Sequence, residues 1–226
     1  MRPYPLFVVA LCAAMACSRD LTSNNSPSTS GTSTSSSGLN ITVDSDFTNR
    51  TAVVGTAIPA IVHVTRSGQP ESGVTVSWVS PDGGSVSPTT SMTDASGAAT
   101  ATWTLGDTAR AYTLTAAITG ASVTMQATAT AGPLAGLLKI TQDSLVVAAG
   151  ASTLITARAV DKTGNPVAGV AISWTTTGGA LTATTTTTGA SGNAEVAFSS
   201  EATPRNYTVT ATAAGVPSVT FTVLAQ

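Results

Sequence analysis

The stretch that decides the fold occurs twice in this chain of 226 residues, as GVTVSWVSPDGG at residues 73–84 and as GVAISWTTTGG at residues 169–179. In each copy apolar residues alternate with small or polar ones up to a tryptophan, a pattern that indicates a strand with one buried face. Two glycines follow, and glycine supplies the positive φ that tight turns need. The string therefore predicts a strand that ends in a turn, with Trp78 and Trp174 facing a core.

Matches on either side of these strings extend the repeat over most of the chain. GQPESGV (68–74) corresponds to GNPVAGV (164–170), 96 positions later, and beyond the Gly-Gly pairs the offset falls to 95. At that offset TDASG (93–97) corresponds to TGASG (188–192). A period near 95 residues is much longer than a solenoid unit and close to the size of an Ig-like domain. We therefore predict an all-β fold of two tandem Ig-like antiparallel β-sandwiches.

The N-terminus has the features of a secretion signal. Arg2 precedes the apolar run LFVVALCAAMA, which is too short to cross a bilayer as a permanent helix and ends in small residues. The following Ser/Thr-rich stretch has almost nothing to bury, so we expect it to stay flexible. The predicted segments are a signal peptide (1–16), a flexible tether (17–38), Ig-like domain 1 (39–131), a linker (132–135) and Ig-like domain 2 (136–226).

Cys12 and Cys17 are the only cysteines, and both lie in the N-terminal segment, so the rest of the chain cannot form an internal disulfide. Cys17 directly follows Ala14-Met15-Ala16. Here the sequence resembles a bacterial lipoprotein signal, in which this cysteine is lipidated, although Ala14 stands where such signals usually carry Leu. The resemblance implies an exported, lipid-anchored outer-membrane protein at the cell surface. The alternative is ordinary cleavage after Ala16, which would leave a free thiol on a secreted or periplasmic protein.

Composition agrees with an all-β chain and excludes some partners. Thr and Val are abundant, and branching at Cβ suits an extended backbone. Charged residues make up 9% of the chain and the net charge is −2, so there is no basic surface for nucleic acid.

Alternation in the other predicted strands gives the remaining core positions. In each case apolar residues at every second position point to one face, as at Ala99, Ala101 and Trp103. The predicted structural core is Val76, Trp78, Trp103, Tyr112, Leu114, Ile172, Trp174, Phe198, Tyr207, Val209 and Phe221.

The strand AIPAIVHV (57–64) is apolar on both faces, so alternation does not fix its buried side. In the second repeat Arg158 is expected to face water, which sets the phase of the equivalent strand. Transferring that phase puts Ile61 and His63 inward. Two alternatives remain: His63 is a hydrogen-bonded residue at the edge of the core, or this strand is shifted by one position.

Residues for chemistry are scarce. The only histidine, His63, lies mid-strand and no G-x-S-x-G motif is present, which argues against a Ser-His-Asp site. One histidine without a mature cysteine pair argues against zinc. Asp44 and Asp46 could help to hold Ca²⁺, but such a site needs six to eight oxygens and nothing else clusters nearby. We predict no enzymatic activity, no catalytic residues, no cofactor and no metal site.

Together the motifs resemble the bacterial Ig-like domains of the invasin and intimin type, the first group of the bacterial Ig-like (Big) families. The resemblance rests on the G-x-P-x-x-G-V turn, the Ser-Trp strand, the Gly-Gly turn, the T-x-A-S-G hairpin and the Tyr-Thr-Leu/Val-Thr-Ala strand, each present twice within residues 39–226. In that family such domains stack as rods that hold adhesive tips away from the bacterium. No outer-membrane barrel or lectin-like tip is visible in this sequence, so the resemblance implies a surface module and carries no receptor with it.

Two functions fit these features. The first is a non-enzymatic, lipid-anchored surface protein whose Ig-like domains act as a spacer or adhesion module, with the membrane and other surface proteins or glycans as partners. The second is a module that binds cell-wall or extracellular polysaccharide. Such a module usually needs exposed aromatic side chains. Once the core tryptophans are removed, Phe47, Trp103 and the three tyrosines remain, and most of these are expected to face inward.

Overall fold

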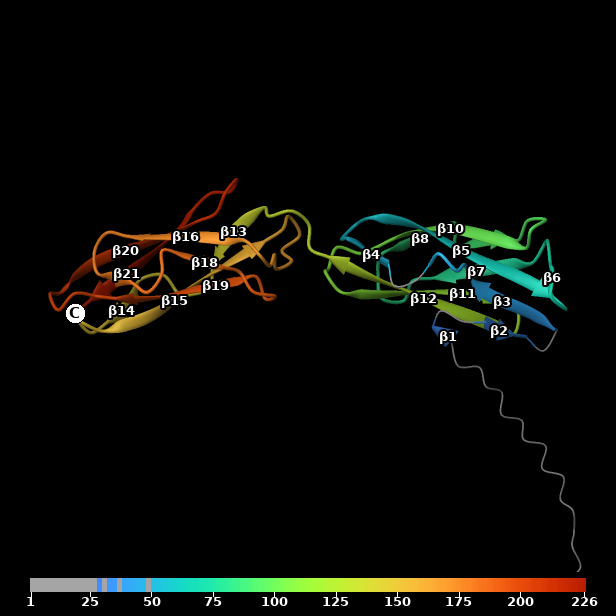
Figure 1. Cartoon of the computed structure of the whole chain (residues 1–226), viewed down its shortest axis with the longest axis horizontal. Helices are drawn as coiled ribbons and strands as arrows, with labels where there is room; N and C mark the ends of the chain where they lie inside the picture. The colour runs from blue at the N-terminus through green and yellow to red at the C-terminus, as the bar shows by residue number, and fades with distance from the viewer. Residues whose placement is uncertain (1–27, 30–31, 36–37, 48–49) are drawn as a thin grey trace, which may run out of the picture.

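The structure is a computed structural model, and it describes residues 28–29, 32–35, 38–47 and 50–226. These residues form four β-sheets and no helix. The sheets pair into two sandwiches that lie end to end (Figure 1), the first built from residues 28–130 and the second from residues 136–225. Each sandwich has its own cluster of buried apolar side chains. The predicted all-β, Ig-like fold is confirmed.

The first sandwich consists of two six-stranded sheets, which we call the β12 sheet and the β5 sheet. The β12 sheet has the order β1-β12-β11-β7-β9, with β4 beside β12; its strands are β1 (Ser28–Thr29), β4 (Arg50–Val53), β7 (Thr75–Val79), β9 (Thr90–Met92), β11 (Ala111–Ile118) and β12 (Ala121–Thr130). The β5 sheet has the order β2-β3-β5-β10-β8, with β6 beside β5; its strands are β2 (Thr32–Thr34), β3 (Leu39–Val43), β5 (Ala57–Arg66), β6 (Gln69–Pro70), β8 (Ser85–Ser87) and β10 (Ala98–Thr104).

The second sandwich repeats this plan with fewer strands. Its β15 sheet has the order β13-β15-β19-β17, from β13 (Gly136–Lys139), β15 (Ser152–Val160), β17 (Ala180–Leu181) and β19 (Asn193–Ser199). Its β20 sheet has the order β14-β21-β20-β16-β18, from β14 (Leu145–Val147), β16 (Ala171–Thr176), β18 (Thr185–Thr187), β20 (Arg205–Thr212) and β21 (Val219–Ala225).

The sandwiches were predicted to be antiparallel, but some of the strand pairs are parallel. In the first sandwich the chain leaves the β5 sheet after β3 and continues as β4 in the β12 sheet, where it pairs parallel with β12. In the second sandwich β13 and β14 make the same crossing, and β14 pairs parallel with β21. The chain keeps its direction when it crosses from one sheet to the other. It therefore pairs antiparallel with its neighbour in the first sheet and parallel with its neighbour in the second.

The predicted flexible tether (17–38) differs from the structure in its last part. Strand β1 pairs parallel with β12, and β2 pairs antiparallel with β3. Strand addition uses backbone N–H and C=O groups, so a segment without apolar side chains can still extend a sheet. The signal peptide and the proposed lipidation at Cys17 lie outside the described residues.

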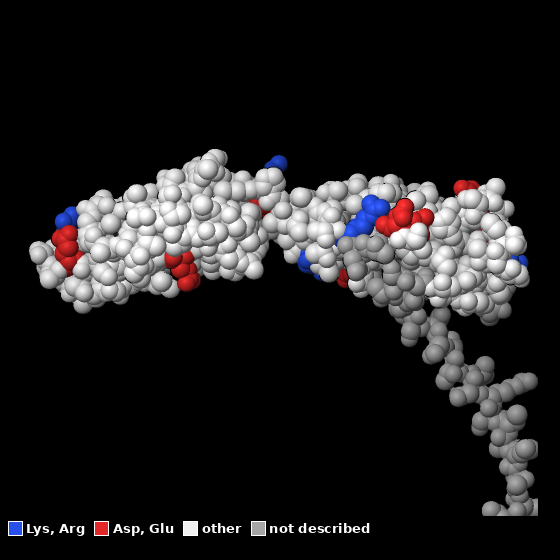
Figure 2. Space-filling view, in the orientation of Figure 1, with Lys and Arg blue, Asp and Glu red and all other residues white. Residues whose placement is uncertain are grey.

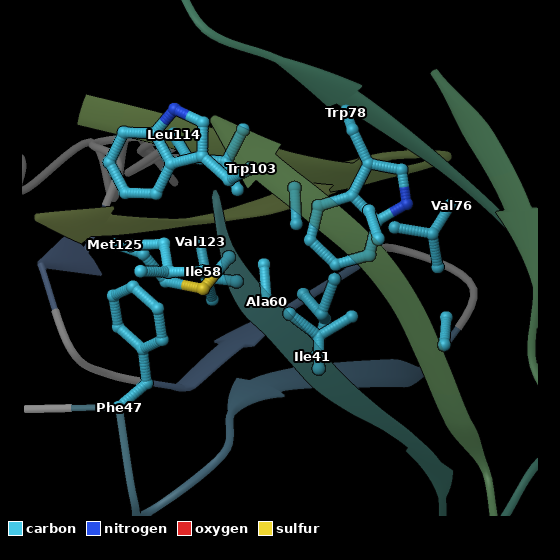
Figure 3. Close-up of a cluster of buried hydrophobic side chains, with 14 of the residues drawn as sticks. Ile41, Phe47, Ile58, Ala60, Val76, Trp78, Trp103, Leu114, Val123 and Met125 are labelled. Atoms are coloured by element: carbon cyan, nitrogen blue, oxygen red, sulfur yellow. The ribbon is translucent and has the colours of Figure 1, made fainter. Parts of the chain in front are cut away.

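The tryptophan of each repeated string lies between the two sheets of its sandwich. Trp78 and Trp174 are each 2% exposed. Their indole N–H groups donate to Ser91 Oγ at 2.9 Å and to Thr186 Oγ1 at 2.8 Å, which are equivalent positions. Figure 3 shows Trp78 and Trp103 pointing into one interior with aliphatic side chains from both sheets. Every residue named above as structural core is 2% exposed or less.

Strand β5 is shifted by one position from the phase transferred from the second repeat. Ile61 and His63 are partly exposed, and His63 makes its hydrogen bond on the outer face of the sheet. The placement of Ile61 and His63 inside the core is therefore wrong, and the alternative of a shifted strand is correct. The buried side chains of β5 are Ile58, Ala60, Val62 and Val64.

Strand pairing gives the reason for this shift. Ile58 lies opposite Trp103, and Thr153 lies opposite Phe198, so these strands correspond at an offset of 95 and not 96. The additional residue lies in the turn that follows the strand. In the first sandwich Thr65 pairs with Pro70, whereas in the second Val160 bridges to Pro166. The two sandwiches therefore differ by one residue in this turn.

Candidate functional site

No cluster of metal-ligating side chains is assembled in the part of the chain that the structure describes. Within residues 28–29, 32–35, 38–47 and 50–226, no three side chains of His, Cys, Asp or Glu come together as metal ligands would. The same residues contain no helix of the length and apolarity needed to cross a membrane. Two polar features remain: a pocket beside the β3–β4 crossing, and the joint between the sandwiches.

One side of the pocket is formed by Asp44, which shares a hydrogen bond with the only histidine of the chain. His63 Nε2 lies 3.0 Å from Asp44 Oδ2, and Asp44 Oδ1 accepts the backbone N–H of Asp46 at 2.9 Å. The hydrogen bond with His63, followed by that from Asp46, holds the pKa of Asp44 below its ordinary value. Both oxygens of Asp44 are thus already bonded to protein groups.

The pocket itself has a volume of about 140 Å³ and is lined by Asp44, Asp46, Phe47, Arg50, Pro59 and Ile61. Phe47 is 4% exposed and stacks on Trp103 with 6.3 Å between ring centroids. The guanidinium of Arg50 lies 5.5 Å from the centre of the Phe47 ring. Phe47 therefore closes the end of the core where the chain changes sheets, and its ring is not offered to a ligand.

The joint is built on the longer turn of the second sandwich. This turn, residues 161–165, is closed by hydrogen bonds from Asp161 N–H to Asn165 O at 2.9 Å and from Gly164 N–H to Asp161 O at 3.1 Å. Asp161 is 4% exposed and Asn165 is 6% exposed. Buried polar side chains need partners, and these two find them partly in their own turn and partly across the joint.

The carboxylate of Asp161 organises this turn and holds the linker. Its Oδ1 accepts the N–H groups of Thr163 at 2.9 Å and of Asn165 at 2.8 Å. Its Oδ2 accepts the N–H of Gly132, which lies between the sandwiches, at 2.8 Å. Burial by itself would raise the pKa of Asp161, but the hydrogen bonds from Asn165, Gly132 and Thr163 outweigh burial and lower it well below its ordinary value.

Asn165 connects the turn directly to the first sandwich. Its Oδ1 accepts the N–H of Ala109 at 2.8 Å, and its Nδ2 donates to the backbone carbonyl of Asp107 at 2.8 Å. The same amide group also donates to Asp161 Oδ2 at 2.9 Å. The Asn165 side chain thus accepts one hydrogen bond from, and donates one to, a loop more than fifty positions away in the sequence.

The loop that receives Asn165 is itself fixed by a buried tyrosine. Tyr112 donates its hydroxyl to the carbonyl of Thr108 at 3.0 Å and accepts the N–H of Thr108 at 3.3 Å. A similar tyrosine bond recurs in the second sandwich, where the N–H of Glu201 donates to the Tyr207 hydroxyl at 3.0 Å. This is the tyrosine-corner arrangement of Ig-like sandwiches. It presents the backbone groups of residues 107–109 in a fixed position.

A cleft of about 220 Å³ remains at the joint. Both sandwiches and the linker contribute to its wall, which is formed by Val53, Val54, Asp107, Gly132, Pro133, Asp161, Lys162 and Thr163.

Sequence reasoning missed Asp161 and Asn165. The available signal was the change of offset between the repeats, from 95 in the strands before this turn to 96 after it. Such a change marks an inserted residue, and the insertion falls in the sequence that contains both side chains.

Comparison with known sequences gives a match for the second sandwich. Residues 136–224 match the model of the bacterial Ig-like domain (group 1). No curated protein sequence matches the chain.

Several solved structures are similar to this chain. The D0–D1 domain of intimin is 24% identical, with 80% of this chain and 96% of that chain covered and a TM-score of 0.30. Invasin, described as a bacterial integrin-binding protein, is 26% identical, with 83% and 39% covered and a TM-score of 0.39. A glycosyl hydrolase family 2 member from Bacteroides cellulosilyticus is 16% identical, with 77% and 24% covered and a TM-score of 0.40. The matched residues 136–224 span nearly the whole second sandwich, so the similarity to the bacterial Ig-like domain (group 1) covers that sandwich.

Proposed function

We propose that this chain is a non-enzymatic bacterial surface protein in which two Ig-like sandwiches, with predicted boundaries at residues 39–131 and 136–226, serve as a spacer or adhesion module. The family match of the second sandwich is the observation that carries the proposal. It is supported by the signal-like N-terminus, in which Arg2 precedes a short apolar run.

The surface of the sandwiches suits a spacer. Figure 2 shows that charged side chains form only a few small groups on the face in view, and most of that face is uncharged. The outer faces of the strands carry mainly Thr, Ser and Ala, as in β20, where Thr208, Thr210 and Thr212 alternate with buried residues. Contacts with other surface proteins would then rely on exposed strand edges, which can pair through their backbone.

We further propose that Cys17 is the point of attachment to the outer membrane. Membrane fractions from cells that express the chain, its C17S variant and its C12S variant are compared by intact-mass analysis. The wild-type and C12S chains are expected to begin at Cys17 and to carry the added mass of acyl chains, whereas C17S is expected in the soluble fraction. A wild-type chain that is cleaved after Ala16 but carries no acyl mass would overturn the anchor.

The spacer or adhesion role is tested separately on cells. Cells that display the full chain are compared with cells whose chain lacks residues 39–226, for adhesion to surfaces and to one another. We expect loss of adhesion, or loss of assembly of partner surface proteins, when these residues are removed. Unchanged adhesion and unchanged assembly would contradict the role even where the anchor is present.

The alternative of polysaccharide binding is less well supported. Every aromatic side chain among the described residues is at most 4% exposed, and sugar-binding surfaces usually use an exposed ring. Binding of the purified chain to a glycan array, abolished by one surface substitution that leaves the fold intact, would reverse this preference.

A further inference from the structure

The joint between the sandwiches contains buried polar groups that have no counterpart at the equivalent positions of the other sandwich. The first sandwich shows this for the turn, because it closes the equivalent hairpin with Ser67 and Gly68 alone, both at positive φ, between the paired residues Arg66 and Gln69. A two-residue turn of this type is sufficient to join two strands. The buried carboxylate and amide of Asp161 and Asn165 are therefore additional to what the hairpin requires.

The second sandwich shows the same for the receiving loop. Arg110 and Arg205 occupy equivalent positions, since each guanidinium lies over the tyrosine two residues later, at 4.7 Å from Tyr112 and 4.9 Å from Tyr207. The residue before each arginine is Ala109 in the first sandwich and Pro204 in the second. Proline has no N–H, so the loop folds without the donor that Asn165 uses at the joint.

We propose that Asp161 and Asn165 form a latch that holds the two sandwiches at one fixed angle, so that the pair moves as a single rigid body. Asn165 holds the first sandwich through Ala109 N–H and Asp107 O, and Asp161 holds the linker through Gly132 N–H. The inference goes beyond a spacer role, because it concerns the geometry of the chain whatever the chain displays.

Burial is the reason why this latch holds. Asp161 and Asn165 are each less than a tenth exposed. If the sandwiches swung apart, the N–H groups of Gly132 and Ala109 would exchange short, enclosed hydrogen bonds for water, and the amide of Asn165 would lose both partners in the first sandwich. The receiving loop is held by Tyr112 and the donating turn by Asp161, so both halves of the contact are in place before they meet and little ordering is required.

The contact is also specific for this joint. The free end of the first sandwich carries Ser67-Gly68 in place of the longer turn, and the free end of the second carries Pro204 in place of Ala109. Neither end can make the Asn165 contact with another copy of the chain. The latch therefore fixes the angle within one molecule and does not extend it into a filament.

The distance between the sandwiches provides the test. In a full chain with Cys12 and Cys17 replaced by Ser, spin labels are placed at T102C in β10 and S173C in β16, both exposed positions, and their separation is measured by double electron–electron resonance. We expect one narrow distance distribution. The variants N165A and A109P are expected to broaden it, whereas the control N206A, at an exposed asparagine of β20, is expected to leave it narrow.

Amide hydrogen exchange on the same proteins shows whether the latch itself opens. The Ala109 N–H is expected to exchange roughly tenfold faster in N165A, because its only bond crosses the joint, while amides of the central strands keep their protection. If N165A instead exposes the core of the second sandwich, A109P decides the outcome, since it leaves the Asp161–Asn165 turn intact. A broad distribution in the parent chain, or narrow distributions in both N165A and A109P, would overturn the latch.

Discussion

The two sandwiches have equivalent cores, and the hairpin that follows β5 differs from the one that follows β15. In the first sandwich β5 turns into β6 through Ser67 and Gly68, whereas in the second the chain takes one residue more and buries Asp161 and Asn165. The strands before the turn, β5 and β15, are equivalent in their pairing with β10 and β19. The same interior positions are therefore buried in both sandwiches. The turn after the strand differs between them, and only the turn of the second sandwich contacts the neighbouring sandwich.

The largest change in the free energy of unfolding is expected at the core tryptophans, where the two sandwiches are most alike. Replacing Trp78 or Trp174 by Ala removes an indole that is 2% exposed, together with its hydrogen bond to the partner hydroxyl. Each substitution is expected to cost about 3–5 kcal/mol in free energy of unfolding. Urea unfolding of the two variants measures both costs.

The matched control for these variants is L154A, because Leu154 is a large apolar residue of the second sandwich that is 53% exposed. Its replacement is expected to change stability by no more than about 0.5 kcal/mol. If one tryptophan substitution reduced the free energy of unfolding much less than the other, the two cores would not be equivalent. The repeat would then hold for the sequence and not for the packing.

The Gly-Gly turns give the next largest effect. Gly179 has φ of +69°, and a Cβ added there would lie 2.4 Å from the carbonyl oxygen of Ser199. Gly84 in the first sandwich has φ of +77°, and its Cβ would lie 2.3 Å from the carbonyl oxygen of Thr104. Alanine at either position must bear the cost of positive φ, about 1–2 kcal/mol, and in addition a clash with backbone that cannot easily move, about 1–3 kcal/mol.

Gly169 separates these two costs. Its φ is +77°, but nothing lies within 4 Å of an added Cβ. The variant G169A is therefore expected to lose only the cost of positive φ, and G179A is expected to be less stable than G169A in thermal or urea unfolding. Equal stability of the two variants would mean that close approach of the strands does not constrain the turn.

Substitution of Asp161, in the hairpin that differs between the sandwiches, is expected to have an intermediate effect on the free energy of unfolding, and this effect should depend on pH. The pKa of Asp161 is lower in the folded chain than its ordinary value of 3.8. The ionised carboxylate therefore stabilises the folded state, fully above pH 5 or so and progressively less as the pH falls below 4 towards the folded pKa. D161N is expected to cost about 1–3 kcal/mol at pH 7, because buried N–H groups lose their acceptor.

The measurement is urea unfolding of wild type and D161N at pH 7, 5 and 3. The difference between them is expected to be similar at pH 7 and 5 and smaller at pH 3. D46N is the control, because Asp46 is exposed and lies in the first sandwich, away from the joint. A difference that stayed constant down to pH 3 would mean that the charge of Asp161 contributes nothing and that only its shape matters.

Most of the fold could be predicted from the sequence, because buried strands and tight turns require particular residue types at fixed spacing. Alternation identified the buried residues at Val76, Trp78 and Trp174, and the glycine pairs marked the turns. The phase of β5 could not be read in this way, because Ile58, Ala60, Ile61 and Val62 are all apolar. Only the pairing of β5 with β10 settles it.

The joint was not predictable from alternation, because it depends on where two loops meet. Asp161 and Asn165 look like ordinary turn residues in the sequence, and turn residues are usually exposed. Their burial follows from the position of the loop at residues 107–109, which belongs to the other sandwich. Strands β1 and β2 were also not predicted. They pair through backbone groups, so their side chains show no apolar pattern in the sequence.

The smallest effect on the free energy of unfolding is expected at the crossings between sheets, where the two sandwiches have different polar side-chain pairs. In the first sandwich His63 pairs with Asp44 at 3.0 Å, and in the second Lys139 pairs with Asp143 at 2.6 Å. The His63 and Asp44 side chains are 39% and 27% exposed. A pair with this exposure contributes about 0.2–1 kcal/mol. Asn at position 44 could also still accept the Asp46 N–H, which limits the loss further.

A double-mutant cycle with D44N and H63Q measures the coupling between these two side chains. Because the pKa of Asp44 is lowered in the folded state, the contribution of its charge is present at neutral pH and declines as the pH falls below its ordinary value of 3.8 towards the folded pKa. The coupling is therefore expected to be smaller at pH 3 than at pH 7. A coupling well above 1 kcal/mol at pH 7 would place this pair among the groups that determine the stability of the first sandwich, and the crossing would then be more than a change of sheet. A coupling within the expected range leaves the hairpin as the place where the two sandwiches differ in a way that affects the whole molecule.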